Sequence, residues 1–234
     1  MKIGLIGAME EEIEILKQKL ENRMEKEILG NKRYTGQIGP FDIVLLQSGI
    51  GKVNAAIGTT LLIHEEKPDY IINTGSAGGF NQTLNVGDVV ISSEVRYHDA
   101  DATVFGYEYG QIPQMPPSFE PHPFLVSIAE KAAKHNHTIQ AIKGLIATGD
   151  SFMSDGERVD FIKSKFPSIQ ACEMEAAAIA QVCYQFHVPF VIIRSLSDIA
   201  GKDANISFDQ YLVTAAKHSA ELILSMLEEL KEHA

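Results

Sequence analysis

Short apolar runs and amphipathic stretches follow one another along the chain, and this alternation predicts most of its secondary structure. The apolar runs are continuous and rich in β-branched residues, which is typical of strands buried on both faces. They predict strands at 3–6, 34–37, 41–47, 68–73, 87–95, 139–147 and 190–193. Apolar residues at helical spacing predict a helix from residue 10, one that ends near residue 66, and others at 123–135, 159–166, 171–186 and 208–230.

The order of these elements indicates the fold class. Because helices separate most of the strands, we predict an α/β fold, a three-layer αβα sandwich with a mixed central sheet. The chain has 234 residues, of which 45% are hydrophobic and 22% charged, enough for one sizeable core. We therefore expect a single domain that spans 1–234.

The strand predicted at 190–193 ends abruptly in polar residues, which are Arg194, Ser195, Ser197 and Asp198. In open α/β sheets, ligands bind just beyond the carboxyl ends of the strands. Four polar side chains at that edge therefore indicate a binding or catalytic site. The alternative is an ordinary loop, in which Asp198 caps the following segment and Arg194 pairs with a surface acid.

Three consecutive glutamates, Glu10, Glu11 and Glu12, begin the first predicted helix. Their only role could be to complement the positive end of the helix dipole. Their directions differ, however, because successive residues of a helix are rotated by about 100°. Glu12 falls about 60° from the centre of the apolar face, whereas Glu11 points nearly the opposite way. Glu12 is therefore the glutamate that can reach a pocket beyond the first strand.

Two glycine-rich segments follow predicted strands. The first, Ser-Gly-Ile-Gly-Lys-Val-Asn at 48–54, lacks the third glycine of a dinucleotide fingerprint, and Val53 stands where a P-loop needs serine or threonine. The second, Thr-Gly-Ser-Ala-Gly-Gly-Phe at 74–80, has bare backbone amides that can approach a ligand closely. We interpret Ser76 as a ligand contact, although a tight turn alone would also explain this segment.

Two further segments carry side chains that are unusual at their positions. Phe152 and Met153 follow a predicted strand, where a planar ligand could stack, although core packing would also explain either residue. Glu175 lies four residues before Ile179 and shares its face of the predicted helix, whereas Glu173 points elsewhere. A buried carboxylate is costly unless something hydrogen-bonds it, so we favour ligand binding by Glu175 over stabilisation of a helix N-terminus.

The stretch from Gly106 to Pro123 contains five of the nine prolines, together with tyrosine, methionine and phenylalanine. A loop of this length inside a compact domain is usually a lid, a binding loop or an interface. Its apolar and aromatic content argues against a solvated linker. We predict that it forms a contact surface between subunits.

The composition narrows the class of protein further. The formal net charge of −11 opposes binding to nucleic acids and anionic membranes. No apolar run reaches the roughly 18 residues that a membrane helix needs, and the early glutamates interrupt any secretory signal. Cys172 and Cys183 are too far apart for a metal knuckle or a redox pair, and the scattered histidines suggest no metal site. We therefore expect a cytoplasmic protein with reduced cysteines and no bound metal.

One edge of the predicted sheet thus gathers a set of candidate site residues: Glu12, Ser76, Phe152, Met153, Glu175, Arg194 and Asp198. The set combines three carboxylates and one guanidinium with apolar and aromatic side chains. It lacks the basic clamp that a phosphorylated ligand would need. It suits a neutral polyhydroxyl compound that carries a flat ring.

Several short motifs carry a family resemblance. They are Gly-Ala-Met-Glu-Glu-Glu at 7–12, Ser-Gly-Ile-Gly-Lys-Val-Asn-Ala-Ala at 48–56, Asn-Thr-Gly-Ser-Ala-Gly at 73–78, Tyr-His-Asp-Ala-Asp at 97–101, Glu-Met-Glu-Ala at 173–176 and Ser-Asp at 197–198. Over essentially its whole length the chain resembles the 5′-methylthioadenosine/S-adenosylhomocysteine nucleosidases. The resemblance implies the nucleoside phosphorylase fold, a homodimer, and hydrolysis of the adenine–ribose bond without a cofactor, as part of methionine salvage.

By resemblance, two acids carry the chemistry. Asp198 would protonate adenine N7 with help from Ser197, and Glu12 would orient and deprotonate the attacking water near Ser76 and Arg194. The same division of labour is familiar from glycoside hydrolysis, in which an oxocarbenium-like state needs an acid at the leaving group. That acid must stay neutral near pH 7, which requires burial or a charged neighbour to raise its pKa.

The resemblance also implies contacts to the ribose and the base. Glu175 would bind the ribose hydroxyls with Met174 packed beneath the sugar, and we place Glu173 in the same substrate-binding set. Phe152 would stack on adenine while the backbone of Met153 reads its edge.

The other implied contacts surround the 5′ end of the substrate. Gly78 would contact the substrate, and the 5′-thioether pocket would be lined by Met9, Ile50 and Phe208. Phe105 and Pro113 would arrive from the partner subunit, which would explain the proline-rich loop. A pocket of Met and Phe adapts to several 5′-substituents, so 5′-deoxyadenosine and futalosine-type nucleosides stay open as substrates.

Two alternatives share the predicted fold. A purine nucleoside phosphorylase would use phosphate in place of water, but binding that dianion takes several cations, and only Arg194 stands among the candidates. A non-catalytic nucleoside-binding protein would need neither Glu12 nor Asp198. We therefore expect a hydrolase.

Overall fold

The computed structural model describes residues 1–135, 140–200 and 204–233, with the side chains at 204–207 and 209 also left out. Its strands belong to one mixed sheet in the order β2-β3-β4-β1-β5-β10-β6-β9-β8-β7. Their bounds are β1 Lys2–Gly7, β2 Glu21–Ile28, β3 Asn31–Ile38, β4 Phe41–Gln47, β5 Tyr70–Asn73, β6 Ser76–Gly79, β7 Val89–Tyr97, β8 Ala141–Thr148, β9 Ile169–Glu173 and β10 Phe190–Ile199.

Strand β10 lies at the centre of this sheet. It pairs in parallel with β5 and β6, while its middle part, residues 193–195, also pairs antiparallel with β7. Since β7 continues through β8 and β9 back to β6, this half of the sheet closes on itself. The other half is open, and β2 forms its edge.

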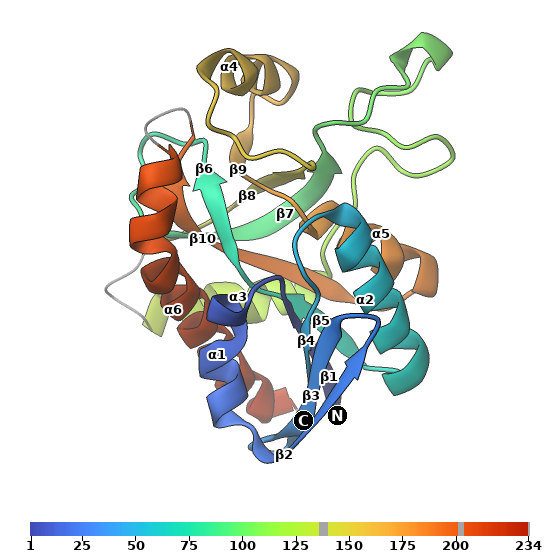
Figure 1. Cartoon of the computed structure of the whole chain (residues 1–234), viewed down its shortest axis with the longest axis vertical. Helices are drawn as coiled ribbons and strands as arrows, with labels where there is room; N and C mark the ends of the chain where they lie inside the picture. The colour runs from blue at the N-terminus through green and yellow to red at the C-terminus, as the bar shows by residue number, and fades with distance from the viewer. Residues whose placement is uncertain (136–139, 201–203, 234) are drawn as a thin grey trace.

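Helices cover both faces of the sheet (Figure 1). Their bounds are α1 Glu10–Lys19, α2 Lys52–Glu66, α3 Pro123–His135, α4 Gly156–Lys165, α5 Ala176–Phe186 and α6 Ala204–Leu230, with short 3₁₀ turns at Thr103–Phe105 and Lys231–His233. One apolar core joins α1, α3 and α6 to one face of the sheet, and a second joins α2 and α5 to the other face. The predicted three-layer αβα sandwich with a mixed sheet is confirmed.

Two strands have no apolar signal in the sequence. Strand β2 was not predicted because it is an edge strand whose side chains are almost all exposed, so burial imposes no hydrophobic pattern on it. Strand β6 occupies the segment that the glycine content suggested to be a turn. A glycine-rich strand is possible here because β6 lies between two other strands, β10 and β9, whose backbones supply its hydrogen bonds.

Two predicted boundaries are wrong by five residues or more. The helix expected from residue 171 begins only at Ala176, because Ile169–Glu173 pairs with its neighbours as β9. The strand expected to end at 193 continues to Ile199, and its polar residues are buried within the sheet. The strand predicted from residue 139 starts beyond the described residues, and the described part of β8 begins at Ala141.

The stretch between β7 and α3 projects from the body of the molecule, at the upper right of Figure 1. Arg96 anchors its near end by donating to the Pro117 carbonyl, and Val95 forms a β-bridge with Phe119. Across the residues that the structure describes, no helix is both long and apolar enough to cross a bilayer.

Candidate active site

A cavity of about 220 Å³ opens where the carboxyl ends of β1, β6 and β10 meet the starts of α1, α2 and α5. This is the edge at which ligands bind in α/β sheets. Fourteen of the predicted site residues lie at this cavity: thirteen line it, and one lies behind its wall. Those that line the cavity are Met9, Glu12, Ile50, Ser76, Gly78, Phe152, Met153, Glu173, Met174, Glu175, Ser197, Asp198 and Phe208. Arg194 lies directly behind its wall.

Glu12 sits in the first turn of α1, and its side chain turns back toward the loop after β1. One oxygen accepts from the amides of Ala8 and Met9 at 2.8 and 3.1 Å. The other accepts from the Ser76 amide at 2.8 Å and the Ser76 hydroxyl at 3.0 Å. Four donors and no acceptor surround this buried carboxyl, which matches the ionised form. Of the three consecutive glutamates, Glu12 is the one that lines the cavity, as the helical geometry predicted.

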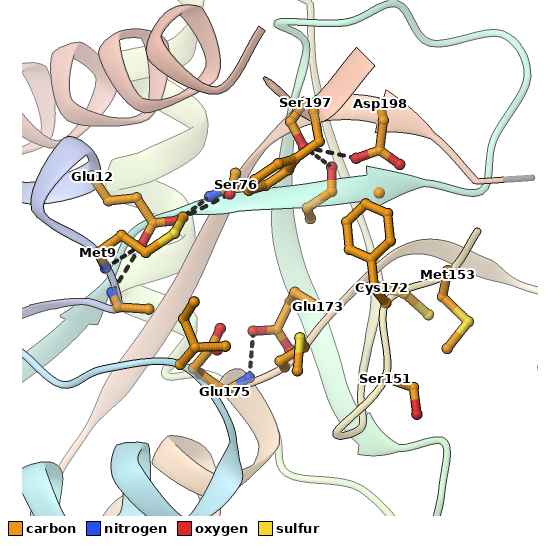
Figure 2. A pocket seen from close by; sticks show the side chains of 17 residues that line it. Met9, Glu12, Ser76, Ser151, Met153, Cys172, Glu173, Glu175, Ser197 and Asp198 are labelled. Carbon is orange, nitrogen blue, oxygen red and sulfur yellow. Dashed lines mark hydrogen bonds between the residues drawn. The ribbon is translucent and has the colours of Figure 1, made fainter. Parts of the chain in front are cut away.

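Asp198 lies on the far side of the cavity from Glu12, as Figure 2 shows. The residue is only 2% exposed, and burial raises the pKa of its carboxyl even though the Ser197 hydroxyl donates to it at 2.8 Å. A raised pKa keeps a carboxylic acid protonated at higher pH, which a proton donor requires. A side chain at Gly78 would approach within 3.0 Å of the Asp198 carboxyl, so glycine keeps the space beside the acid free.

Ser197 and Asp198 both line the cavity although they are consecutive residues of one strand. In a regular strand, successive side chains point to opposite faces of the sheet. The pairing of β10 with β6 shifts register between Leu196 and Asp198, and such an irregularity re-aims a side chain. The irregularity therefore brings both groups to the same site.

Arg194 is buried inside β10, so the loop interpretation with a surface ion pair is wrong. Its guanidinium forms an ion pair with Glu173, donates to the Asn73 side chain at 2.8 Å, and lies 3.6 Å from Glu175. A Cβ atom at Gly75 would come within 2.1 Å of it, so only glycine admits the guanidinium here. Arg194 therefore reaches the site by way of the carboxylates that it contacts.

The predicted helix directed Glu173 away from the site, but in the structure Glu173 lines the cavity. It ends β9, and one of its oxygens accepts from the amides of Glu175 and Ala176, both at 2.9 Å. Its other oxygen accepts from the Thr148 hydroxyl. With Arg194 also bound, Glu173 is saturated by partners of this chain and caps the start of α5.

Glu175 precedes α5 and so cannot share a helical face with Ile179, yet its side chain still lines the cavity. Its carboxyl accepts from the Gly51 amide at 2.9 Å. Burial, reinforced by the negative charge of Glu173, raises the pKa of Glu175 to about 8. Near pH 7 this carboxyl is therefore largely protonated, and it can both donate and accept hydrogen bonds.

Apolar side chains form the rest of the wall. The ring of Phe152 stands edge-on to that of Phe208, with centroids 5.6 Å apart, and remains 43% exposed. Met153 follows Phe152 in the sequence but is buried, so of these two residues only Phe152 presents an open face to a ligand. Such a surface suits a flat heterocycle on one side of a polar sugar site.

Two predicted residues lie elsewhere. Phe105 ends the 3₁₀ turn Thr103–Phe105 and is 79% exposed, and Pro113 is also exposed in the projecting loop. Neither belongs to the cavity of the same chain. Four residues that were not predicted also line the cavity: Ala8, Ala77, Ser151 and Cys172. Each is the sequence neighbour of a predicted residue, but no sequence signal marks these four side chains themselves.

Metal ligation finds no support in the described ranges, where no three His, Cys, Asp or Glu side chains are grouped to hold an ion. No lysine, arginine or histidine is among the described residues that line the cavity. The described lining supplies carboxyl and hydroxyl groups beside an apolar wall.

Comparison with known proteins places this geometry in a family. The model of the phosphorylase superfamily matches residues 2–228. A 5′-methylthioadenosine/S-adenosylhomocysteine nucleosidase from a Geobacillus species is 61% identical, over 99% of this chain and 100% of its own length.

Two solved structures agree. The nucleosidase of the same name from Colwellia psychrerythraea, in complex with adenine, is 53% identical with a TM-score of 0.96, covering 98% of this chain and 96% of its own. The enzyme from Neisseria meningitidis, in complex with methylthio-immucillin-A, is 46% identical with a TM-score of 0.96, covering 98% and 99%. This chain therefore belongs to the 5′-methylthioadenosine/S-adenosylhomocysteine nucleosidase family of the phosphorylase superfamily.

Proposed function

We propose that this chain hydrolyses the N-glycosidic bond of 5′-methylthioadenosine and S-adenosylhomocysteine, releasing adenine and the 5′-thio-substituted ribose. One observation carries the proposal: two carboxyl groups in contrasting environments, Glu12 surrounded by hydrogen-bond donors and Asp198 with a pKa raised by burial, face one cavity from opposite sides. Divergent environments for two acids are the signature of acid–base pairs. The names of the family's relatives supply the substrates.

In the proposed reaction, Asp198 donates its proton to N7 of adenine while the C1′–N9 bond breaks and its electron pair leaves with the base. The water oxygen bonds to C1′, and Glu12 accepts the proton that the water loses. Asp198 ends ionised and Glu12 ends protonated, so exchange with solvent restores both before the next turnover. Ser197 orients the general acid, Asp198, through its 2.8 Å hydrogen bond. Ser76 holds the general base, Glu12, by donating a hydrogen bond to it.

The remaining lining residues bind the nucleoside. Glu175 receives the ribose hydroxyls, for which a protonated carboxyl offers both a donor and an acceptor. Met174 supports the sugar, and Phe152 stacks on adenine beside the backbone of Met153. Gly78 leaves room for the base, and the 5′-thioether group occupies the apolar corner formed by Met9, Ile50 and Phe208. Glu173 and Arg194 support this set from behind.

Adenine release in buffers with and without phosphate tests the proposal. The pure protein is expected to release adenine from 5′-methylthioadenosine at the same rate in both buffers, because none of the described residues that line the cavity is a cation that could bind a phosphate dianion. Chromatography of the products provides the measurement. Strict dependence on phosphate would instead identify a phosphorylase, and binding without release would identify a nucleoside-binding protein.

We further propose a cytoplasmic homodimer that serves methionine salvage, in which Phe105 and Pro113 complete the site of the partner. The support is a set of large apolar side chains that remain exposed in the single chain: Val104, Phe105, Ile50, Val53, Ile57, Tyr184 and Phe186. Exposed apolar side chains in such number indicate an interface.

Light scattering on the wild-type chain is expected to give the mass of two chains. Phe105→Ala should raise KM for 5′-methylthioadenosine about tenfold, because burial of a phenylalanine contributes about 1.5 kcal/mol. Leu29→Ala is the matched control, since Leu29 is equally exposed but lies at the β2–β3 turn. A monomeric mass, or a KM that does not respond to Phe105→Ala, would refute the shared site.

A further inference from the structure

Two of the motifs that define this chain contain charged residues that do not line the cavity. Lys52 begins α2, directly after the glycine-rich turn, and Asp99 follows β7. Their side chains form an ion pair of 2.6 Å and are only 26% and 19% exposed. The pair lies between two segments that do line the cavity, one containing Ile50 and the other Ser151 to Met153.

Asp99 also binds the backbone of the adenine-side segment. The same carboxylate oxygen that meets Lys52 accepts from the Asp150 amide at 3.0 Å. Burial by itself would raise the pKa of Asp99, but the bonds from Lys52 and Asp150 outweigh it and hold the pKa below its ordinary value. The carboxylate is therefore ionised at every pH near neutrality and keeps both partners.

Asp150 passes this restraint to the ribose side of the cavity. Its side chain accepts from the Lys52 amide at 2.8 Å, at the first position of α2. The preceding amide, that of Gly51, donates to Glu175 at 2.9 Å. Gly51 has a φ of +94°, and a Cβ there would come within 3.1 Å of Asp150, so this junction leaves little room to shift.

We propose that Asp99, paired with Lys52, is a positioning residue that holds the adenine-binding segment and the ribose carboxyl of Glu175 at a fixed separation. The segment from Gly149 to Asp155 has no helix or strand of its own to order it, which makes an external restraint necessary. Asp99 supplies that restraint through Asp150. It touches no substrate and acts only through these neighbours.

The restraint acts on binding and leaves the reacting groups in place. Glu12 and Asp198 lie on α1 and β10, and neither is bonded to Asp99, Lys52 or Asp150. Loosening the segment weakens contacts to adenine and ribose that are made equally in the bound substrate and in the transition state. Loss of such uniform binding raises KM and leaves kcat unchanged.

Kinetics of Asp99→Asn, Lys52→Met and the double variant with 5′-methylthioadenosine test this role, which rests on the proposed function. Each single change is expected to raise KM about tenfold and to change kcat less than about threefold. The effects of the double variant on KM should fall well short of the product of the two single effects, because both changes remove the Lys52–Asp99 ion pair, although Lys52 also lies 3.8 Å from Asp150. Lys2→Met is the matched control, as it breaks an ion pair of similar exposure at the opposite end of α2 and should leave KM unchanged.

Unchanged KM in both single variants, KM effects that multiply in the double variant, or a loss confined to kcat would each overturn the positioning role. If Asp99→Asn unfolds at the assay temperature, Lys52→Met alone still decides, because without Lys52 the Asp99 carboxylate that holds the Asp150 amide is no longer anchored to α2. A wild-type chain that releases no adenine would refute the proposed function instead, so the two failures are distinct.

Discussion

Asp198→Asn is expected to lower kcat for adenine release by about 10²–10⁴-fold, the usual contribution of a general acid. The amide keeps the shape of the carboxyl and can still accept the Ser197 hydrogen bond, but it has no proton to give to the leaving base. Because adenine is a poor leaving group when unprotonated, the loss should fall on kcat. Chromatographic measurement of adenine provides the rate.

The pH dependence of the wild-type enzyme should report the same group. Burial raises the pKa of Asp198, so its protonated form persists to higher pH than that of an ordinary aspartic acid. Because the acid must be protonated to act, kcat at saturating substrate should fall as pH rises through this pKa, and Asp198→Asn should lack that fall. Asp160→Asn, an exposed change on α4, is the control and should keep the wild-type rate. A variant at Asp198 that keeps more than about a tenth of the activity would show that another group is the acid.

Glu12→Gln should cost a similar factor, about 10²–10⁴ in kcat, because glutamine cannot accept the proton of the attacking water. Here a loss of stability is also expected. Two of the four donors around Glu12 would meet an amide nitrogen that itself donates, leaving buried groups unpaired at a cost of about 1–3 kcal/mol.

Rate and stability can be separated by measuring thermal unfolding beside turnover. Glu11→Gln is the matched control, since Glu11 directly precedes Glu12 in the same helix and is exposed. It should keep both the rate and the unfolding temperature. If Glu12→Gln is less stable but turns over at the wild-type rate, Glu12 has a structural role only and another group must activate the water.

The sequence identified the candidate site residues, but it assigned several of them to the wrong secondary structure. The rotation between successive helical residues was enough to single out Glu12, because α1 begins where the acidic run begins. Glu175 was selected by a helical face that does not exist, since the helix starts one residue later. Glu175 nevertheless lines the cavity. A buried carboxyl needs a hydrogen-bond partner whatever its secondary structure, and for Glu175 that partner is the Gly51 amide.

By itself the sequence determined the α/β class, the helices on both faces and the segments that meet at the site, because burial on two faces leaves a local record in runs of β-branched residues. Only the tertiary structure decided how far β10 extends, where the edge strand β2 runs, and how Arg194 and Glu173 are paired. Those features depend on hydrogen bonds and charges between residues far apart in the chain, and such partners leave no periodic pattern in the sequence around either one.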